Sequence, residues 1–296
     1  MNQLIAALPS DELQRLYPLL EPIELTLGRV LYDVGSSPGY VWFPTDGIVS
    51  LVAQTGSGST SEIAVVGNEG VVGVGLLMGG ETMLNRAVVQ RAGRGLRLAA
   101  SVFRAALYPS SPVLRLLLRY TQALMAQLGQ VAVCNRHHNV RQQLCRWMLM
   151  SLDRLPGNEL VTTQLRIASM LGVRREGVTE AALQLQRDGL IRCSRGRILV
   201  VDRKGLERQC CECYAVVSNE YGRLLPSQQP GLRHWPATGH AAEAPPAKPA
   251  THRRTGPGAS HHHTRACQSG AGQNGAGQRA ATVHGAHGDD SHRHGH

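Results

Sequence analysis

The spacing of apolar residues changes its period along the chain. Residues 10–20 have leucines at helical spacing, and residues 23–98 then contain brief apolar or alternating runs separated by Gly, Pro, Asp and Ser. Such runs predict short strands joined by tight turns. After Ser101 the helical period returns. We therefore predict an α+β fold that begins with an antiparallel β-roll of the cupin-like jelly-roll type, over residues 1–110, and continues in helices.

A long helix is predicted over residues 111–136, where the apolar residues form two neighbouring stripes. One stripe can pack on the roll while the other meets the same helix of a second copy in a parallel homodimer. The alternative is that both stripes belong to the core of a monomer. The second stripe contains Leu118, Met125 and Ala132. We assign dimerisation to the heptad stripe, which consists of Leu114, Leu117, Thr121, Leu124, Leu128 and Val131.

The next pattern predicts two short helices followed by a hairpin. Thr163 can cap the first helix, and Gly172 is placed to end it in a left-handed conformation. A second apolar-periodic run begins after Arg174 and closes at Asp188-Gly189. Two apolar runs then flank the basic sequence Ser194-Arg195-Gly196-Arg197, which is typical of a hairpin tip. This order predicts a winged helix-turn-helix, and we place that domain at residues 137–215.

Charge favours DNA as the partner of this region. A helix-turn-helix with a solvated charged face also occurs in proteins that never bind DNA. Between residues 160 and 210, however, there are ten Lys and Arg but only five Asp and Glu. Several of these basic side chains lie where we expect the domain to contact a DNA duplex. The residues that we expect at double-stranded DNA are Thr163, Gln164, Arg174, Arg175, Glu176, Thr179, Glu180, Arg195 and Arg197.

Composition limits the remaining possibilities. The chain has 296 residues and a formal net charge of +10, which suits a polyanionic partner. Residues 227–296 hold eleven of the thirteen histidines. Because this tail is rich in Gly, Ala and Pro and has almost no apolar periodicity, we expect it to be disordered. Its predicted role is that of a nonfunctional or weakly DNA-attracting extension.

Location and reaction chemistry are constrained by what the sequence does not contain. The N-terminal segment has no basic leader, and no apolar stretch approaches the roughly 20 residues of a membrane span, so a cytoplasmic protein without a membrane partner is expected. The seven cysteines are then expected to be reduced. There is no nucleophile elbow, phosphate loop, metal-spaced His/Glu motif or paired-carboxylate arrangement, so we do not expect an enzyme.

Three segments make residues 1–215 resemble one protein family. They are Trp42-Phe43-Pro44 with Gly47-Ile48-Val49-Ser50, Cys134-Asn135-Arg136 with Arg146-Trp147, and the run from Leu171 to Arg175 with Val178-Thr179. In this order they resemble the Crp/Fnr family of bacterial transcription regulators. The resemblance implies a cyclic-nucleotide-binding-like roll that senses a signal, a helix that relays it, and a dimer that binds a palindromic operator. RNA polymerase is a further candidate partner.

The resemblance also suggests which residues read the operator. The family's base-contacting positions fall on Arg175, Glu176 and Glu180. The first two match the family pattern, whereas the third is often Arg in other members. The operator preferred by this chain therefore need not be the familiar one. The remaining alternative is a nucleotide-binding regulatory protein that acts on a protein partner without DNA.

The effector stretch departs from the cyclic-nucleotide pattern. In members that bind cyclic nucleotides, a Gly-Glu pair holds the ribose and an Arg followed by Ser or Thr holds the phosphate. The matching positions here are Gly73, Val74, Asn85, Arg86 and Ala87. An apolar residue thus replaces both the carboxylate and the hydroxyl, and this argues against cyclic AMP. Another small-molecule effector and a purely structural roll both remain open.

No metal or cofactor is predicted. The family's oxygen sensors have an N-terminal cysteine cluster, and here no cysteine precedes Cys134. A last helix is expected from Asp202 through the run Cys210-Cys211-Glu212-Cys213, where neighbouring cysteines would point apart and a fourth ligand is missing. We interpret Cys134 and Cys145 as small hydrophobic residues, and His137-His138 as polar residues at a helix junction.

Overall fold

The N-terminal part of the chain is an antiparallel β-roll. The computed structural model describes residues 1–108 and 111–225, so the expectation for residues 227–296 falls outside the described residues. One sheet has the strand order β1-β7-β3 and the other has the order β2-β6-β4-β5, with every pairing antiparallel. The strands are β1 (Glu21–Leu25), β2 (Val30–Tyr32), β3 (Tyr40–Pro44), β4 (Ile48–Gln54), β5 (Thr60–Val66), β6 (Arg86–Arg91) and β7 (Gly93–Ala99). The predicted fold class is confirmed for this part.

The core of the roll is made by apolar residues of both sheets. Val41 on β3, Val49 on β4 and Val66 on β5 have no exposed surface. One close backbone crossing needs glycine, because a Cβ atom at Gly93 would lie 2.5 Å from the backbone nitrogen of Gly47. The short helices α1 (Gln3–Ala6), α2 (Ser10–Leu16) and α3 (Ala100–Ala105) flank the strands in sequence, together with the 3-10 turns η1 (Tyr17–Leu19) and η2 (Val74–Leu76).

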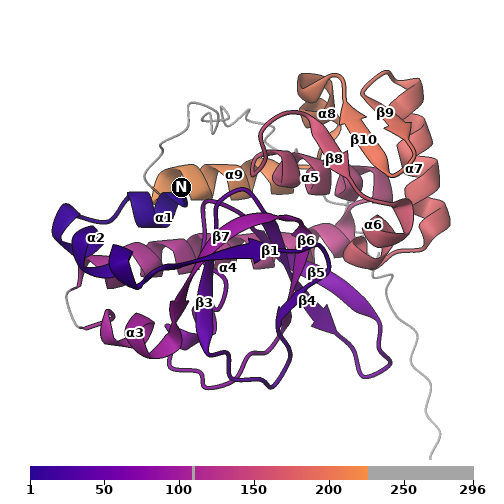
Figure 1. Ribbon diagram of the computed structural model, residues 1–296. Helices are drawn as coiled ribbons and strands as arrows, with labels where there is room; N and C mark the ends of the chain where they lie inside the picture. Colours follow the sequence, from indigo (N-terminus) through magenta and orange to yellow (C-terminus); the bar gives the residue numbers. More distant parts are fainter. Residues whose placement is uncertain (109–110, 226–296) are drawn as a thin grey trace, which may run out of the picture. The chain divides into compact units, whose positions relative to one another are not determined.

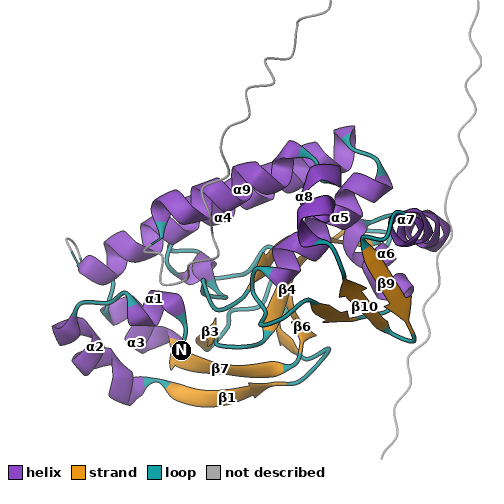
Figure 2. Cartoon of the chain, turned by 90° about the horizontal axis from the view of Figure 1, so that it is seen from above, coloured by secondary structure: helices purple, strands orange, loops and turns teal. Residues whose placement is uncertain are grey.

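The long helix α4 (Pro112–His137) leaves the roll and carries the chain to the C-terminal region. It packs against β5 and against the last helix, α9 (Glu212–Leu224). Figure 2 shows α4 and α9 side by side. They are antiparallel, because Cys134 contacts Cys211 at one end and an Arg119 amino group lies 3.5 Å from the Arg223 carbonyl oxygen at the other.

The structure changes the assignment of the two stripes on α4. The heptad stripe that the sequence analysis gave to dimerisation is largely buried inside the protomer: Leu117, Thr121, Leu124 and Val131 are buried, and Leu114 and Leu128 are half-buried. Side chains covered by their own chain are not available to a partner helix. The sequence could not show this, because the elements that cover α4 are distant in sequence: the roll comes before it, and α9 comes well after it. The second stripe is exposed, with Leu118 at 52% and Met125 at 64%.

The C-terminal region combines short helices with a three-stranded sheet of order β8-β10-β9. Its elements are α5 (Val140–Leu152), β8 (Glu159–Val161), α6 (Gln164–Leu171), α7 (Arg175–Arg187), β9 (Ile191–Ser194), β10 (Arg197–Val200) and α8 (Arg203–Gln209). The sequence predicted the hairpin but missed β8, whose three residues are too few to show a period. Among the described residues, no helix combines the length and apolar character that crossing a membrane requires.

The last predicted helix is in fact two helices. Asp202 caps α8, as expected, by accepting a hydrogen bond from the Gly205 amide at 2.8 Å. The chain then becomes extended at Cys210 and Cys211, and α9 begins at Glu212. The cysteine run therefore lies at a corner between helices rather than along one helix.

A hairpin of the roll touches the winged region. The Thr60 and Ser169 hydroxyls lie 3.0 Å apart and join β5 to α6 (Figure 1). Beside them, a Cβ atom at Gly172 would lie 3.3 Å from the Ser61 hydroxyl. The roll and α6 therefore meet through small, mostly exposed polar groups.

A buried ion pair joins the roll to the helices. Arg154, which follows α5, donates to Glu69 of the roll at 2.8 Å, and both side chains are 7% exposed. Another Arg154 amino group lies 3.2 Å from the side-chain oxygen of Gln127 on α4. The same oxygen accepts from the Tyr221 hydroxyl of α9 at 3.1 Å. One guanidinium group thus connects four segments of the chain.

This ion pair yields a prediction about stability. Arg154→Met should lower the free energy of unfolding by about 3–5 kcal/mol, because the Glu69 carboxylate is left buried without its partner. Arg154→Met combined with Glu69→Gln removes both charges and should cost less than Arg154→Met alone. Urea denaturation of Arg154→Met, of Glu69→Gln, of the double variant and of the wild type measures these values. Strictly additive losses would contradict the proposed coupling.

Candidate nucleic-acid interface

Local residues fix the turn between α6 and α7. The Thr163 hydroxyl accepts a hydrogen bond from the Arg166 amide at 3.2 Å and caps α6. Gly172 ends that helix with a φ of 67°, a left-handed conformation that glycine adopts without strain. The Val173 amide then donates to the Ala168 carbonyl at 3.0 Å and closes the corner. The cap and the turn predicted from the sequence are both confirmed.

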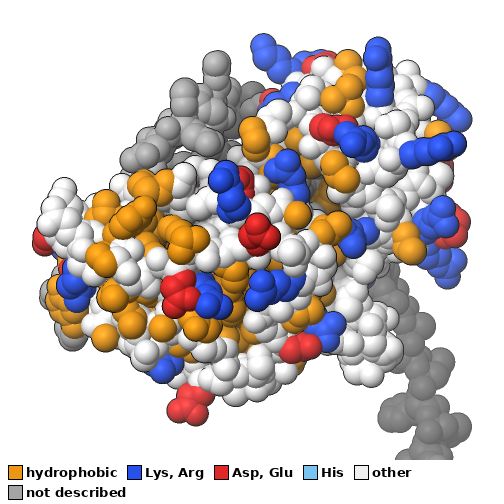
Figure 3. All heavy atoms as spheres, viewed as in Figure 1, with side chains coloured by type: hydrophobic (Ala, Val, Ile, Leu, Met, Phe, Trp, Pro, Cys, Tyr) orange, Lys and Arg blue, Asp and Glu red, His pale blue; other side chains and the backbone are white. Residues whose placement is uncertain are grey.

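The helix α7 has one buried face and one exposed face. Val178, Ala181, Ala182 and Leu185 are buried against the rest of the winged region. The predicted residues Arg174, Arg175, Glu176 and Glu180 are all exposed. Figure 3 shows Lys and Arg side chains gathered on the part of the surface that contains α6, α7 and the hairpin.

Two of the predicted contact residues hold the helices together. The Thr179 hydroxyl on α7 donates to the Gln164 side-chain oxygen on α6 at 2.8 Å. It also lies 3.0 Å from the Arg175 carbonyl oxygen. Thr179 and Gln164 therefore fix the angle between α6 and α7, in addition to any contact with a ligand.

The hairpin presents arginines at and beside its tip. Arg195 is exposed in the turn next to Gly196, whose φ is 70°. Arg197 lies on β10 and pairs with Glu159 of β8 at 3.1 Å, so part of its charge is neutralised within the protein. Arg192 on β9 is also exposed and was missed by the sequence analysis. Its place directly after the buried Ile191 is the alternation that could have found it.

A groove lies between the start of α7 and the hairpin. It brings together four of the predicted residues, Thr163, Gln164, Arg175 and Arg197, with both hydroxyl and guanidinium groups. The other five predicted residues, Arg174, Glu176, Thr179, Glu180 and Arg195, do not line it. The complete lining is Thr162, Thr163, Gln164, Leu165, Arg175, Cys193, Ser194, Gly196, Arg197 and Ile198.

Two of the expected effector residues, Asn85 and Arg86, form hydrogen bonds with other side chains of the roll. Both Arg86 nitrogens that face Asp33 donate to its carboxylate, at 2.9 and 2.7 Å. Hydrogen bonding from Arg86 lowers the pKa of Asp33, so the pair stays charged at neutral pH. The Asn85 oxygen accepts from the Tyr32 hydroxyl at 3.0 Å, and Ala87 is fully buried. Gly73 is left-handed and leads into η2, which begins at Val74.

A second group of side chains contains three of the cysteines and one histidine. The ligand atoms of Cys134, His138, Cys211 and Cys213 all lie within 4.8 Å of one another. Cys134 and His138 come from the end of α4, more than seventy residues before Cys211 and Cys213, and the sequence analysis did not group them with the cysteine run. Because Cys211 precedes α9 and Cys213 lies in its first turn, the two sulfurs do not diverge as they would inside one helix.

Comparison with known proteins identifies the winged region. Residues 142–209 match the family model of the Crp-like helix-turn-helix domain. This chain contains such a domain. A comparison with curated proteins finds no match.

The fold is that of solved Crp/Fnr-type regulators. FixK2 from Bradyrhizobium japonicum is 17% identical with a TM-score of 0.56, covering 65% of this chain and 98% of that chain. A Crp/Fnr-family transcriptional regulator from Thermus thermophilus is 23% identical with a TM-score of 0.51, covering 64% and 97%. The c-di-GMP-responsive global regulator CLP from Xanthomonas campestris is 17% identical with a TM-score of 0.52, covering 66% and 100%.

The Crp/Fnr resemblance found in the sequence is thus confirmed at the level of the fold and of the helix-turn-helix domain.

The contacts in the roll yield a prediction about cyclic-nucleotide binding. Cyclic AMP or cyclic GMP should leave the melting temperature of the protein unchanged, because Arg86 is held by Asp33 and Val74 offers no acceptor to ribose hydroxyls. Asp33→Ala frees the arginine but restores no acceptor, so it should not create binding either. Thermal-shift measurements with each nucleotide check this, since a ligand that binds only the folded state raises stability. A dose-dependent rise in the wild type would show the expectation to be wrong.

Proposed function

We propose that this protein is a sequence-specific, DNA-binding transcription regulator that acts as a homodimer on a palindromic operator. The observation that carries the proposal is the Crp-like helix-turn-helix, whose second helix begins with exposed arginines beside a basic hairpin. The proposal requires no reaction chemistry from the chain.

The start of α7 is suited to the major groove. Recognition helices contact base edges with their N-terminal residues. The N-terminal end of a helix also has partial positive charge, which favours approach to phosphates. Arg174 and Arg175 add two full charges there, and no carboxylate of the described chain pairs with either within 4.0 Å. This end of α7 can therefore contact both the bases and the phosphate backbone of DNA.

Roles can be divided among the exposed residues. Arg175 fits bidentate contact with guanine, and Glu176 and Glu180 can accept from the amino group of cytosine. We assign Arg174, Arg192, Arg195 and Arg197 to phosphates on either side. Such contacts fix the position of the protein without reading sequence.

The exposed stripe of α4 is the proposed dimer contact. Its residues alternate in spacing by four and three positions, as in a coiled coil. Gly129 lies in the middle with no atom within 4 Å of a Cβ position, so two helices can approach closely there. A parallel pair would present two reading helices to two half-sites. The stripe consists of Leu118, Gln122, Met125, Gly129, Ala132 and Arg136.

The rival function is a nucleotide-dependent regulator of a protein partner without DNA. The engagement of Arg86 by Asp33 disfavours nucleotide binding. Basic groups on both the reading helix and the hairpin also have no use in such a protein. The nature of any effector stays open, and contact with RNA polymerase stays a prediction to which we assign no residues.

Replacement of Arg175 tests sequence reading. Arg175→Ala should weaken binding to a duplex selected from a random pool by about 10- to 100-fold, which corresponds to about 1–3 kcal/mol. Its affinity for unselected DNA should change only a few-fold. Arg195→Ala is the matched control, because loss of a phosphate contact weakens all duplexes alike and lowers the slope of log affinity against log salt by about one. Fluorescence anisotropy over a salt series measures both quantities.

Two outcomes of that series would count against the proposal. Equal losses on selected and unselected duplexes would remove Arg175 from base reading. If the wild-type protein fails to bind any duplex in dilute salt, the rival function is favoured.

Replacement of Met125 tests the dimer. Met125→Glu places a charge in the middle of the exposed stripe and should yield a monomer, with operator affinity lower by about 100-fold or more because the two heads no longer bind together. Leu84→Glu is the control, since it replaces another exposed apolar side chain, at 89%, on the roll. Sedimentation equilibrium gives the mass of each variant. If the Met125→Glu protein is still a dimer, the interface does not include this stripe and lies elsewhere.

A further inference from the structure

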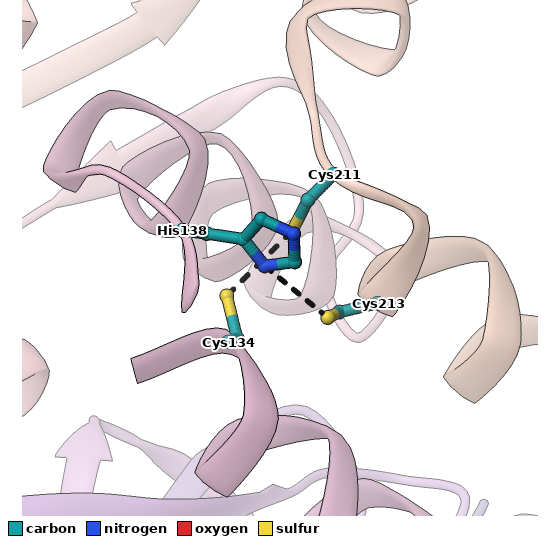
Figure 4. Close-up of side chains that lie close together, drawn as sticks. All are labelled: Cys134, His138, Cys211 and Cys213. Carbon is teal, nitrogen blue, oxygen red and sulfur yellow. Dashed lines mark hydrogen bonds between the residues drawn. The ribbon is translucent and has the colours of Figure 1, made fainter. Parts of the chain in front are cut away.

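The corner between α8 and α9 faces the C-terminal end of α4. Cys134 lies in the last turn of α4, and His138 follows the helix directly. Cys211 and Cys213 approach from the start of α9. Figure 4 shows the three sulfurs and the imidazole ring pointing toward one another. The two pairs are 73 residues or more apart in sequence, so only the folded chain brings them together.

Two of the separations between ligand atoms equal the edges of a tetrahedral centre, and all of them lie within 4.8 Å. The Cys134 and Cys211 sulfurs lie 3.6 Å apart, and the Cys213 sulfur lies 3.6 Å from Nδ1 of His138. With zinc–sulfur bonds of about 2.3 Å and zinc–nitrogen bonds of about 2.0 Å, a tetrahedron has edges of about 3.5–3.8 Å. A disulfide instead needs a sulfur–sulfur distance of about 2.05 Å. The cysteines are free thiols in this structure.

Groups around the four side chains match the surroundings of a metal site. The other imidazole nitrogen, Nε2 of His138, lies 3.3 Å from the Glu212 carboxylate, which leaves Nδ1 directed at the sulfurs. Histidine ligands commonly donate their second ring N–H to such a carboxylate. The side-chain amide of Gln143 donates to the His138 carbonyl oxygen at 2.8 Å and holds the turn in which that histidine lies.

A buried arginine balances the charge. Three thiolates, a neutral histidine and a divalent cation sum to one negative charge, which is costly to bury alone. Nε of Arg146 lies 3.2 Å from the Cys134 sulfur, and the residue is only 5% exposed. Its guanidinium group therefore compensates a negative centre. With three neutral thiols in its place, Arg146 would be a buried cation facing no anionic group in the cluster.

Burial indicates a structural centre. Cys134 and Cys213 have no exposed surface, and Cys211 is 5% exposed. Four protein ligands complete a tetrahedron and leave no position for water or substrate, as in structural zinc sites. A set of three thiolates and one imidazole favours zinc over the oxygen-seeking cations.

We propose that Cys134, His138, Cys211 and Cys213 bind one structural Zn²⁺ ion that fastens the start of α9 to the end of α4. The inference does not depend on DNA binding. The site lies where α4 gives way to α5, so the ion would fix the junction between the long helix and the helix-turn-helix domain.

The test uses the full chain and must separate this site from the eleven histidines of residues 227–296. Cobalt distinguishes them, because thiolate ligands give near-ultraviolet charge-transfer bands that histidines do not. Protein purified with reductant should retain one more equivalent of zinc than Cys211→Ser, and Co²⁺ should produce thiolate bands and tetrahedral visible bands only when Cys211 is present. Cys193→Ser, which removes an exposed thiol outside the cluster, should behave as the wild type.

Further variants keep the test decisive if Cys211→Ser does not fold. His138→Cys should still bind the ion as a four-thiolate site, with stronger cobalt charge-transfer bands. Glu212→Gln should retain the site and weaken zinc affinity by about 10- to 100-fold in chelator competition. A strong chelator should lower the melting temperature of the wild type and of Cys193→Ser, and leave that of folded Cys211→Ser unchanged.

Several results would overturn the proposal. They are a zinc content that is equal in wild type and Cys211→Ser, cobalt spectra without thiolate bands, and a disulfide between Cys134 and Cys211 in freshly reduced protein. An iron-containing chromophore in the purified protein would replace zinc by an iron centre and would equally reject the assignment.

Discussion

The charge of Arg154 has to be neutralised inside the protein, and this constraint holds the described chain together. Its guanidinium group reaches Glu69 of the roll and Gln127 of α4, and Tyr221 of α9 reaches the same glutamine. A buried cation is tolerated only where several partners are positioned at once. The roll, the long helix and the last helix must therefore take their places together, which defines the platform on which the helix-turn-helix domain is carried.

Elements with local causes were predictable from the sequence. Thr163 and Gly172 bound the first helix of the reading motif through their own hydrogen bonds and backbone conformation, and Gly196 lies in the turn of the hairpin. Periodicity was sufficient for the roll and for α4. These features depend on residues that are close together in sequence.

Features that depend on distant residues were not predictable. The heptad stripe of α4 looked free because the elements that cover α4, the roll and α9, are distant from it in sequence. Likewise the grouping of Cys211 and Cys213 with Cys134 and His138 could not be foreseen, because the two pairs are far apart along the chain. The pairing of Arg197 with Glu159 needed β8, which is too short to be seen as a pattern. In each case the chemistry of the side chain can be read from the sequence, whereas its neighbours are determined by the fold.

The contact between the β4–β5 hairpin and α6 has a mechanical consequence. It rests on the Thr60 and Ser169 hydroxyls, and an exposed hydrogen bond of this kind adds only about 1 kcal/mol, because water replaces it readily. By comparison, the roll is joined to the helices by the ion pair between Arg154 and Glu69, whose side chains are both 7% exposed. Because the buried ion pair is strong and the exposed hydrogen bond is weak, the winged region can rotate away from the hairpin while its connection through Arg154 is kept.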